Sequence, residues 1–196
     1  MSKRAFDLLG ASLGLVLLAP LLLLIALWIR FDSPGPALYR QQRVGRGGRL
    51  FTIYKFRTMQ QRALAGPQLT VGADPRVTRA GRFLRQYKLD ELPQLWNVVL
   101  GDMSLVGPRP EVPRYVDCYP PEQRHVVLSV APGITDWAAI RYKDENAILA
   151  RAADPERAYV ESILPAKLDY YVQYVRERSF WGDLRILAHT FAAILR

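Results

Sequence analysis

Asp90 and Glu91, two adjacent carboxylates, are the residues of this sequence whose types and spacing are best suited to chemistry. At a separation of about 4 Å and an effective dielectric constant near 20, two carboxylates repel each other by about 4 kcal/mol. A folded site that keeps both ionised therefore needs a metal ion or cationic side chains close by. Arg85, Lys88 and Arg109 flank the pair along the chain. This grouping favours phosphate chemistry, with arginines as phosphate ligands and room for a metal ion at Asp90 and Glu91.

The element that must position the pair is a helix predicted over residues 91–100 and ended by Gly101. Asp90 and Glu91 would lie at its N-terminus, where the helix dipole favours negative charge, either the carboxylates or a bound phosphate. An N-cap aspartate with an acidic first turn also occurs commonly without any chemistry. Arg109 favours the chemical interpretation, because it lies between two prolines and such a stiff segment loses little entropy on gripping a phosphate.

A second positioning element is a hairpin, predicted as strands at residues 37–44 and 50–58 around the glycine-rich loop 45–49. Alternation along the second strand places Lys55 and Arg57 on one face. We count both as candidate substrate-binding residues that point together into a site. A solvated strand face is an equally common outcome for such a pair.

The composition narrows the function classes. A chain of 196 residues with a formal charge of +9 and a pI near 9.9 is expected to form one compact domain that binds polyanions: nucleic acid, anionic lipid or phosphorylated substrates. Cys118 is the only cysteine, and His125 and His189 are the only histidines. An internal disulfide, a Cys/His zinc site and a Ser-His-Asp triad are therefore unsupported, and a reducing cytosolic location is the simplest interpretation for the domain.

The N-terminal segment is predicted to insert into a membrane. Residues 8–29 contain no charge and eleven leucines. We therefore divide the chain into a membrane-inserted part, residues 1–31, and a catalytic domain at the membrane interface, residues 32–196. Pro20 predicts a kink, and both flanks carry the positive charge that is typical of the cytoplasmic side, which favours a helix that enters the membrane and returns. From the residues alone, a re-entrant helix and a kinked spanning helix are equally supported.

Several short motifs follow one another along the chain: Lys3-Arg4-x-Phe6-Asp7, Asp32-Ser33-Pro34-Gly35-Pro36, Tyr54-Lys55-Phe56-Arg57, Leu89-Asp90-Glu91-Leu92-Pro93-Gln94, Gly101-Asp102-Met103-Ser104, Gly107-Pro108-Arg109-Pro110 and Pro132-Gly133-Ile134-Thr135. In this order they resemble the bacterial sugar transferases, and the chain resembles a small monotopic phosphoglycosyl transferase. The resemblance runs from Lys3 to about Asp183. Many relatives have glycine at the Asp136 position, which leaves the identity of the sugar open.

The resemblance implies transfer of a sugar phosphate from a UDP-sugar to polyprenyl phosphate, with release of UMP. Asp90 would be the nucleophile of a ping-pong reaction through a phosphosugar-aspartyl intermediate, Glu91 its partner, and Mg²⁺ would bind at both carboxylates. Lys55, Arg85 and Arg109 would hold phosphate oxygens, and Asp183 would be a further carboxylate of the site.

The resemblance also implies a fold and a location. The expected fold is α/β (α+β): a small cytosolic domain with a β-hairpin and several amphipathic or interfacial helices, plus an N-terminal Pro-kinked re-entrant membrane helix. The expected location is the bacterial inner membrane, with the catalytic domain on its cytoplasmic face, at the first membrane step of polysaccharide or glycoprotein assembly. The expected partners are the UDP-sugar, polyprenyl phosphate and membrane lipids, without nucleic acid, and no oligomeric state is predicted.

Two alternatives remain at this point. One is a membrane-tethered, non-enzymatic binder of anionic lipid or nucleic acid, which explains the charge but not the Asp90-Glu91 pair. The other is a different Mg²⁺-dependent phosphoryl-transfer enzyme, such as a nucleotidyl transferase acting on a lipid phosphate, which would release pyrophosphate instead of UMP.

Overall fold

The computed structural model describes residues 3–61 and 69–194; the outermost ends of the two predicted units, residues 1–2 and 195–196, lie outside this part. The chain begins with helix α1 (Lys3–Asp32), followed by strands β1 (Leu38–Val44) and β2 (Leu50–Phe56). The remaining elements are α2 (Arg79–Gln86), α3 (Gln94–Leu100), β3 (Ser104–Val106), α4 (Pro113–Val116), α5 (Pro121–Val127), β4 (Gly133–Thr135), α6 (Trp137–Arg141), α7 (Glu145–Leu149), α8 (Pro155–Ala158), α9 (Leu164–Glu177) and α10 (Phe180–Ile194). The fold is thus a mixture of many helices and little sheet, as the predicted α+β class requires.

The strands form two separate two-stranded sheets. Strands β1 and β2 pair antiparallel in a register that runs from Leu38 opposite Phe56 to Val44 opposite Leu50. The strand that was predicted to reach residue 58 ends at Phe56. Strands β3 and β4 are short and parallel, with Ser104 opposite Gly133. Neither sheet is large enough to form a core by itself, so helices supply most of the buried surface.

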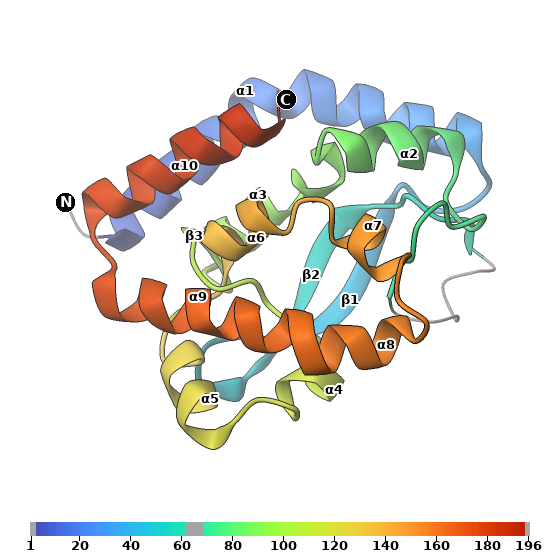
Figure 1. The fold of residues 1–196 in the computed structure, drawn as a ribbon. Helices are drawn as coiled ribbons and strands as arrows, with labels where there is room; N and C mark the ends of the chain where they lie inside the picture. Colours follow the sequence, from blue (N-terminus) through green and yellow to red (C-terminus); the bar gives the residue numbers. More distant parts are fainter. Residues whose placement is uncertain (1–2, 62–68, 195–196) are drawn as a thin grey trace.

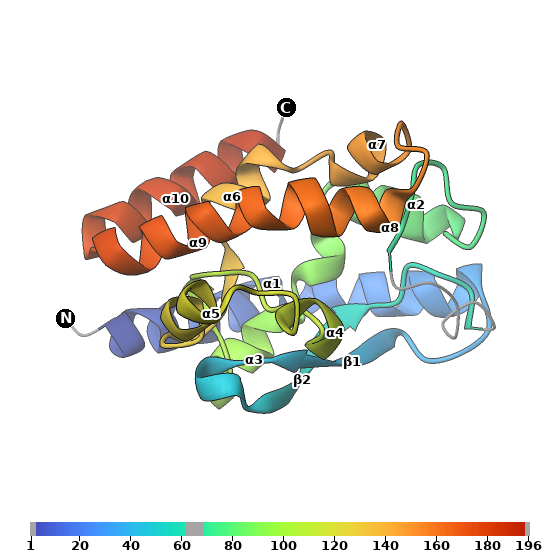
Figure 2. The same ribbon diagram turned by 60° about the horizontal axis from the view of Figure 1, so that its bottom comes forward.

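The helices are arranged around the hairpin in layers. Figure 2 shows α9 and α10 on one side of the molecule and the hairpin on the opposite side, with α1 and α3 between them. The largest buried cluster packs α4 and α5 against α9 and the π-helical turn Tyr159–Ile163 that precedes α9. A second cluster joins α1, β2 and α3 through Ala11, Ile53 and Val98. The helix α1 is therefore packed onto the domain along one face (Figure 1).

Helix α1 exposes its apolar side chains on the other face. Leu13, Val16 and Leu17 are each at least 60% exposed, whereas Ile25 and Ile29 are buried against the domain. By length and composition α1 is able to cross a membrane. It runs as one helix from Lys3 to Asp32 with Pro20 inside it, so the predicted re-entrant path is not confirmed and stays a prediction.

Polar side chains fasten the N-terminal end of α1 to the domain. Arg4 donates to the carbonyls of Val98 and Val99 at the end of α3, at 2.6 and 3.0 Å. Asp7 is buried and accepts hydrogen bonds from the Ser104 hydroxyl and the Leu105 amide at the start of β3. Two motifs of the sequence therefore contact each other and hold α1 against the domain: Lys3-Arg4-x-Phe6-Asp7 and Gly101-Asp102-Met103-Ser104.

Arg57 fastens the other end of α1, and this differs from its predicted role in substrate binding. Its guanidinium is 1% exposed and donates to the carbonyls of five residues at the end of α1 and in the turn after it: Ile29, Ser33, Pro34, Gly35 and Pro36. All three of its nitrogens are engaged in this way. Arg57 lies just after β2, which ends at Phe56, and its buried guanidinium is stabilised by the nearest acceptors, which are carbonyls.

We expect Arg57→Lys to lower the free energy of unfolding by roughly 2–4 kcal/mol, because a single ammonium group leaves several buried carbonyls without a donor. The measurement is urea unfolding in detergent. Arg82→Lys, on the exposed side of α2, is the matched control and should unfold like the parent. Equal midpoints for the two variants would contradict the anchoring role.

Candidate active site

One cavity of about 1570 Å³ collects Lys55, Arg85, Asp90, Glu91 and Arg109 on its walls. These residues come from β2, α2, the segment before α3 and the segment after β3. Arg57 also borders the cavity, but its guanidinium is engaged by the carbonyls described above. The sequence motifs that lie far apart along the chain thus meet in one place.

The local structure of the carboxylate pair differs from the predicted helix start. Asp90 and Glu91 belong to a 3-10 turn, Leu89–Glu91, and α3 begins only at Gln94. Lys88 enters this turn in the left-handed region, with φ of 55°. The predicted helix over residues 91–100 therefore started three residues too early, although Gly101 ends α3 as expected, with φ of 93°. In such a tight turn two adjacent side chains acquire different neighbours.

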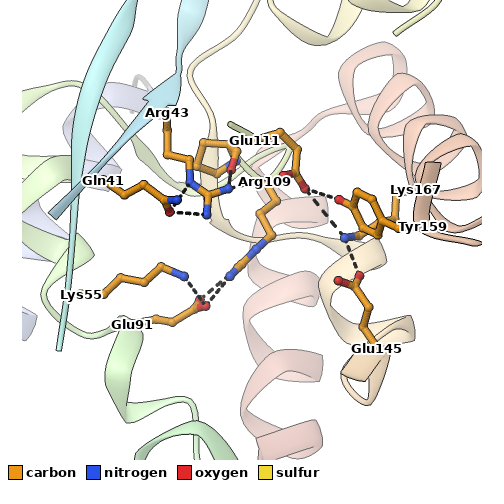
Figure 3. Close-up of polar contacts among 10 residues, drawn as sticks. Gln41, Arg43, Lys55, Glu91, Arg109, Glu111, Glu145, Tyr159 and Lys167 are labelled. Carbon is orange, nitrogen blue, oxygen red and sulfur yellow. Dashed lines mark hydrogen bonds and ion pairs between the residues drawn. The ribbon is translucent and has the colours of Figure 1, made fainter. Parts of the chain in front are cut away.

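Glu91 is held by two cations (Figure 3). Lys55 Nζ lies 3.1 Å from its Oε1, and Arg109 forms a bidentate pair, with Nη1 3.0 Å from Oε2 and Nη2 bonded to Oε1. Burial by itself raises the pKa of Glu91, but Arg109 and Lys55 outweigh it and hold the pKa well below its usual value. Glu91 in turn raises the pKa of Arg109 well above its usual value. Glu91 is thus an ionised group with both oxygens occupied.

Asp90 has the opposite character. It is 9% exposed, and its Oδ1 is buried with no hydrogen-bond partner among residues 3–61 and 69–194. Burial raises the pKa of Asp90, and Glu91 raises it further, while Lys55, Arg85 and Lys88 act in the opposite direction. Asp90 therefore offers an open carboxylate oxygen beside three cations, which is what a nucleophile or a metal ligand requires.

Lys55 reaches Glu91 because Asn97 joins β2 to α3. The Asn97 amide accepts a hydrogen bond from the Tyr54 N–H at 3.0 Å and donates to the Thr52 carbonyl at 2.7 Å, which satisfies the free edge of β2. Asn97 is fully buried. Sequence reasoning missed this residue, and the available signal was an asparagine inside a helix whose neighbours are Trp96 and Val98. Burial also lowers the pKa of Lys55, while Glu91 opposes that change.

Arg85 lies beside Asp90 without bonding to it. Its Nε donates to the Thr58 hydroxyl at 2.8 Å and its Nη1 to the Thr70 hydroxyl at 3.0 Å. Burial lowers the pKa of Arg85, and Asp90 is the strongest of the groups that raise it. Arg85 is therefore a cation that two hydroxyls hold in place and that interacts electrostatically with Asp90.

Arg109 is positioned by a close approach of two backbone segments. A Cβ added to Gly133 would lie 2.0 Å from the Gly107 nitrogen, so no larger residue fits where β3 and β4 meet. The Gly107 amide donates to the Thr135 carbonyl, and the Gly133 amide donates to the Pro108 carbonyl. The two glycine-containing motifs of the sequence thus meet in one close backbone contact, and the Arg109 side chain extends from there to Glu91.

Asp183 does not belong to this site, in contrast to the prediction. It is buried on α10, where it accepts from Lys3 Nζ at 2.6 Å and from the Tyr174 hydroxyl at 2.9 Å. It does not line the cavity. Its carboxylate joins the start of α1 to α9 and α10, so its role in this structure is to hold the helices together.

A second charged network, which sequence reasoning missed, lines the same cavity. Glu111 accepts from the Tyr159 hydroxyl at 2.7 Å and pairs with Arg43 at 3.4 Å (Figure 3). Lys167 lies 3.9 Å from Glu111 and 2.6 Å from Glu145. Burial opposes ionisation of Glu111, yet Lys167 and Arg43 hold its pKa below the usual value. No local pattern links residues so far apart in sequence, so only the fold reveals the network.

The described part of the chain contains no cluster of three or more His, Cys, Asp or Glu residues that suits a metal ion. The carboxylate pair nevertheless fits Mg²⁺ in one respect. Magnesium is commonly bound by one or two carboxylates together with substrate phosphates, and the unpartnered Oδ1 of Asp90 is an oxygen ligand of that kind.

Asp136 yields a prediction about pH. It caps α6 by accepting from the Ala139 amide at 3.0 Å, and burial raises its pKa from 3.8 to about 6. A raised folded-state pKa stabilises the protein below about pH 4, and this contribution is lost as the pH rises through 6. Asp136→Asn should therefore gain up to about 3 kcal/mol of unfolding free energy relative to the parent between pH 4 and pH 8.

Urea unfolding of parent and variant across this pH range measures the difference. Asp117→Asn, at an exposed position, is the control and should show no such trend. A difference between Asp136→Asn and the parent that stays constant with pH would show that Asp136 does not titrate in this window.

Comparisons with known proteins show what this chain is similar to. The family model described as "Bacterial sugar transferase" matches residues 1–196. An Aeromonas hydrophila protein named UDP-N-acetylgalactosamine-undecaprenyl-phosphate N-acetylgalactosaminephosphotransferase is 41% identical over 98% of this chain and 43% of its own length. A Caulobacter vibrioides UDP-glucose:undecaprenyl-phosphate glucose-1-phosphate transferase is 42% identical over 100% of this chain and 70% of its own length. The exopolysaccharide production protein PSS of Rhizobium leguminosarum is 44% identical over 98% of this chain and 94% of its own length.

The chain thus spans less than half of the Aeromonas relative and nearly all of the Rhizobium relative. The match of the family model over every residue, together with these identities, shows that the chain belongs to the bacterial sugar transferase family.

Proposed function

We propose that this chain transfers a sugar phosphate from a UDP-sugar to polyprenyl phosphate, forming polyprenyl diphosphate-linked sugar and UMP. The observation that carries the proposal is the asymmetry of the carboxylate pair: Asp90 keeps an unpartnered oxygen, while Glu91 is occupied by Lys55 and Arg109. The relatives named as transferases of sugar phosphates to undecaprenyl phosphate support the same class of reaction.

The proposed reaction has two displacement steps at one phosphorus. An oxygen of the Asp90 carboxylate attacks the sugar-bearing phosphorus, the bond from this phosphorus to the bridging oxygen breaks, and UMP leaves with that oxygen. An oxygen of polyprenyl phosphate then attacks the same phosphorus, the bond to Asp90 breaks, and the carboxylate is restored. The product retains the sugar phosphate on a new diphosphate linkage. Nucleophilic catalysis of this kind replaces one difficult step with two easier ones.

The surrounding side chains fit this chemistry. Arg85, Lys55 and Arg109 are cations within the cavity that bind phosphate oxygens and offset the charge that develops on them. Glu91 fixes the directions of Lys55 and Arg109 before the substrate arrives. Mg²⁺ would be held by Asp90, whose Oδ1 is unpartnered, together with the diphosphate, and would supply further charge neutralisation. Glu91, the other predicted metal ligand, has both carboxylate oxygens bonded to Lys55 and Arg109.

The membrane supplies the second substrate. A polyprenyl phosphate keeps its chain in the bilayer and its phosphate at the surface, so the reacting groups must meet at that boundary. The exposed leucine face of α1 is suited to anchor the domain there. We place the enzyme at the bacterial inner membrane, with the cavity open to the cytoplasm, where UDP-sugars are available. The proposed place in metabolism is the first membrane step of polysaccharide or glycoprotein assembly.

The first prediction from this proposal concerns Asp90→Asn. With Mg²⁺, polyprenyl phosphate and a panel of UDP-sugars in nanodiscs, the parent should release UMP, and the variant should lose essentially all turnover because an amide is a poor nucleophile. Asp117→Asn is the matched control at an exposed aspartate. Pyrophosphate as the product would instead identify a nucleotidyl transferase, and unchanged turnover in Asp90→Asn would overturn the nucleophile assignment.

The second prediction separates the two carboxylates. Glu91→Gln leaves Asp90 in place but releases the charge that orients Lys55 and Arg109, so kcat/KM should fall by about 100-fold without abolishing the covalent intermediate. Trapping a radiolabelled sugar phosphate on the protein measures this directly. Label on Glu91→Gln and none on Asp90→Asn is expected, whereas label retained on Asp90→Asn would place the nucleophile elsewhere.

A further inference from the structure

The pair formed by Lys167 on α9 and Glu145 on α7 has no part in the reaction steps described above. Lys167 Nζ lies 2.6 Å from Glu145 Oε2 and 3.9 Å from Glu111 Oε1, and its side chain is only 5% exposed. The ammonium group also lies 5.1 Å from the centre of the Tyr159 ring. Both members of the pair line the cavity that contains Asp90 and Arg109.

The pair presents free hydrogen-bonding capacity to the cavity. Glu145 Oε2 accepts from Lys167, and Glu145 Oε1 has no hydrogen-bond partner among residues 3–61 and 69–194. The Glu145 side chain is 23% exposed, so this oxygen is within reach of a ligand. Lys167 has three N–H donors, of which one is directed to Glu145. Glu111 differs, because Tyr159 and Arg43 already bind its two oxygens.

The formal charges of this network are balanced. Arg43 and Lys167 carry two positive charges, and Glu111 and Glu145 carry two negative charges. A carboxylate acceptor beside an ammonium donor is complementary to two neighbouring hydroxyl groups, since each hydroxyl both donates and accepts. Hydrogen bonds to charged groups are also stronger than those between neutral groups.

The position of Glu145 and Lys167 relative to Arg109 indicates which part of a nucleotide sugar would contact these two residues. Arg109 binds Glu91 next to Asp90, and Glu111, two residues further along the chain, faces Lys167 (Figure 3). Arg109 and Lys167 also both act electrostatically on the buried Asp136. In a UDP-sugar the hexose is attached directly to the phosphorus that Asp90 would attack, whereas the uracil is separated from it by a second phosphate and a ribose. This arrangement favours the hexose over the uracil as the group that meets the pair.

We propose that Glu145 and Lys167 form the subsite that recognises the hexose of the donor, with Glu145 Oε1 accepting from one sugar hydroxyl and Lys167 donating to a neighbouring hydroxyl oxygen. This inference rests on the proposed function for the identity of the donor. It predicts that Glu145 contributes to affinity for the sugar and makes no contribution to affinity for the uridine diphosphate part.

Binding experiments in an Asp90→Asn background test the subsite without turnover. Calorimetry compares UDP with UDP-glucose, UDP-galactose and their 2-acetamido counterparts, with and without Glu145→Gln. For the best-bound donor, Glu145→Gln should raise Kd by about 10- to 100-fold, the worth of a hydrogen bond to a charged group. The Kd of UDP should change less than about twofold, because UDP lacks the hexose.

Deoxy analogues of the best-bound donor identify the contact. The analogue that lacks the recognised hydroxyl should bind more weakly than the full donor to the protein that retains Glu145. Glu145→Gln should then raise the Kd of this analogue little further, because in a double-mutant cycle the two changes remove the same contact. Glu161→Gln is the control, because Glu161 forms an exposed ion pair with Arg157 and does not line the cavity. Unfolding midpoints of all variants exclude a general loss of structure.

Several outcomes would overturn the subsite. If Glu145→Gln raised the Kd of UDP and of the UDP-sugars equally, the pair would contact the base or the ribose instead of the hexose. If the affinity losses from Glu145→Gln and from removal of a hydroxyl were additive for every deoxy analogue, Glu145 would not contact any of these hydroxyls. UMP release by the parent reports separately on the proposed function, so failure of the subsite with normal turnover leaves the transferase reaction intact.

Discussion

The ion pairs of Glu91 with Lys55 and Arg109 are the interaction on which the arrangement of the site depends. They join β2, the turn before α3 and the segment after β3, three parts of the chain that have no other reason to present charges to one another. The side chains are 13–26% exposed, so removal of one partner would leave a poorly hydrated charge at a cost of about 3–5 kcal/mol. Because Glu91 binds both cations, Asp90 keeps an unpartnered oxygen beside them.

Charged side chains also attach α1 to the domain. One end is held by Arg4 and Asp7 against α3 and β3, and the other by Arg57 against the turn that follows the helix. These contacts lie on the face of α1 that meets the domain, while the opposite face exposes leucines. Under the proposed function, a helix fixed to the domain at both ends would keep the cavity at a constant height relative to the lipid surface, which would suit the proposed reaction between a dissolved donor and a lipid-bound acceptor.

Much of the fold was accessible from local patterns, and the differences have physical causes. The hairpin was placed within two residues because alternating strands around a glycine-rich loop depend on local geometry. The start of α3 was placed three residues too early. The acidic segment before Pro93 forms a 3-10 turn, in which its backbone amides find hydrogen-bond acceptors as readily as in an α-helix. Arg57 was assigned to the site from strand alternation, and Asp183 from the family resemblance. Each is buried elsewhere and forms hydrogen bonds with neighbouring groups outside the carboxylate site.

By itself, the sequence determined the kinds of group available: an uncharged, leucine-rich helix, a pair of adjacent carboxylates, several cations and the motifs of a transferase family. Only the tertiary structure decided which carboxylate is engaged and which is open, and it alone brought Glu145 and Lys167 to the cavity. The physical reason is that residue type and spacing dictate apolar periodicity and local turns. Ionisation and hydrogen bonding depend instead on burial and on distances between segments that approach each other only when the chain has folded.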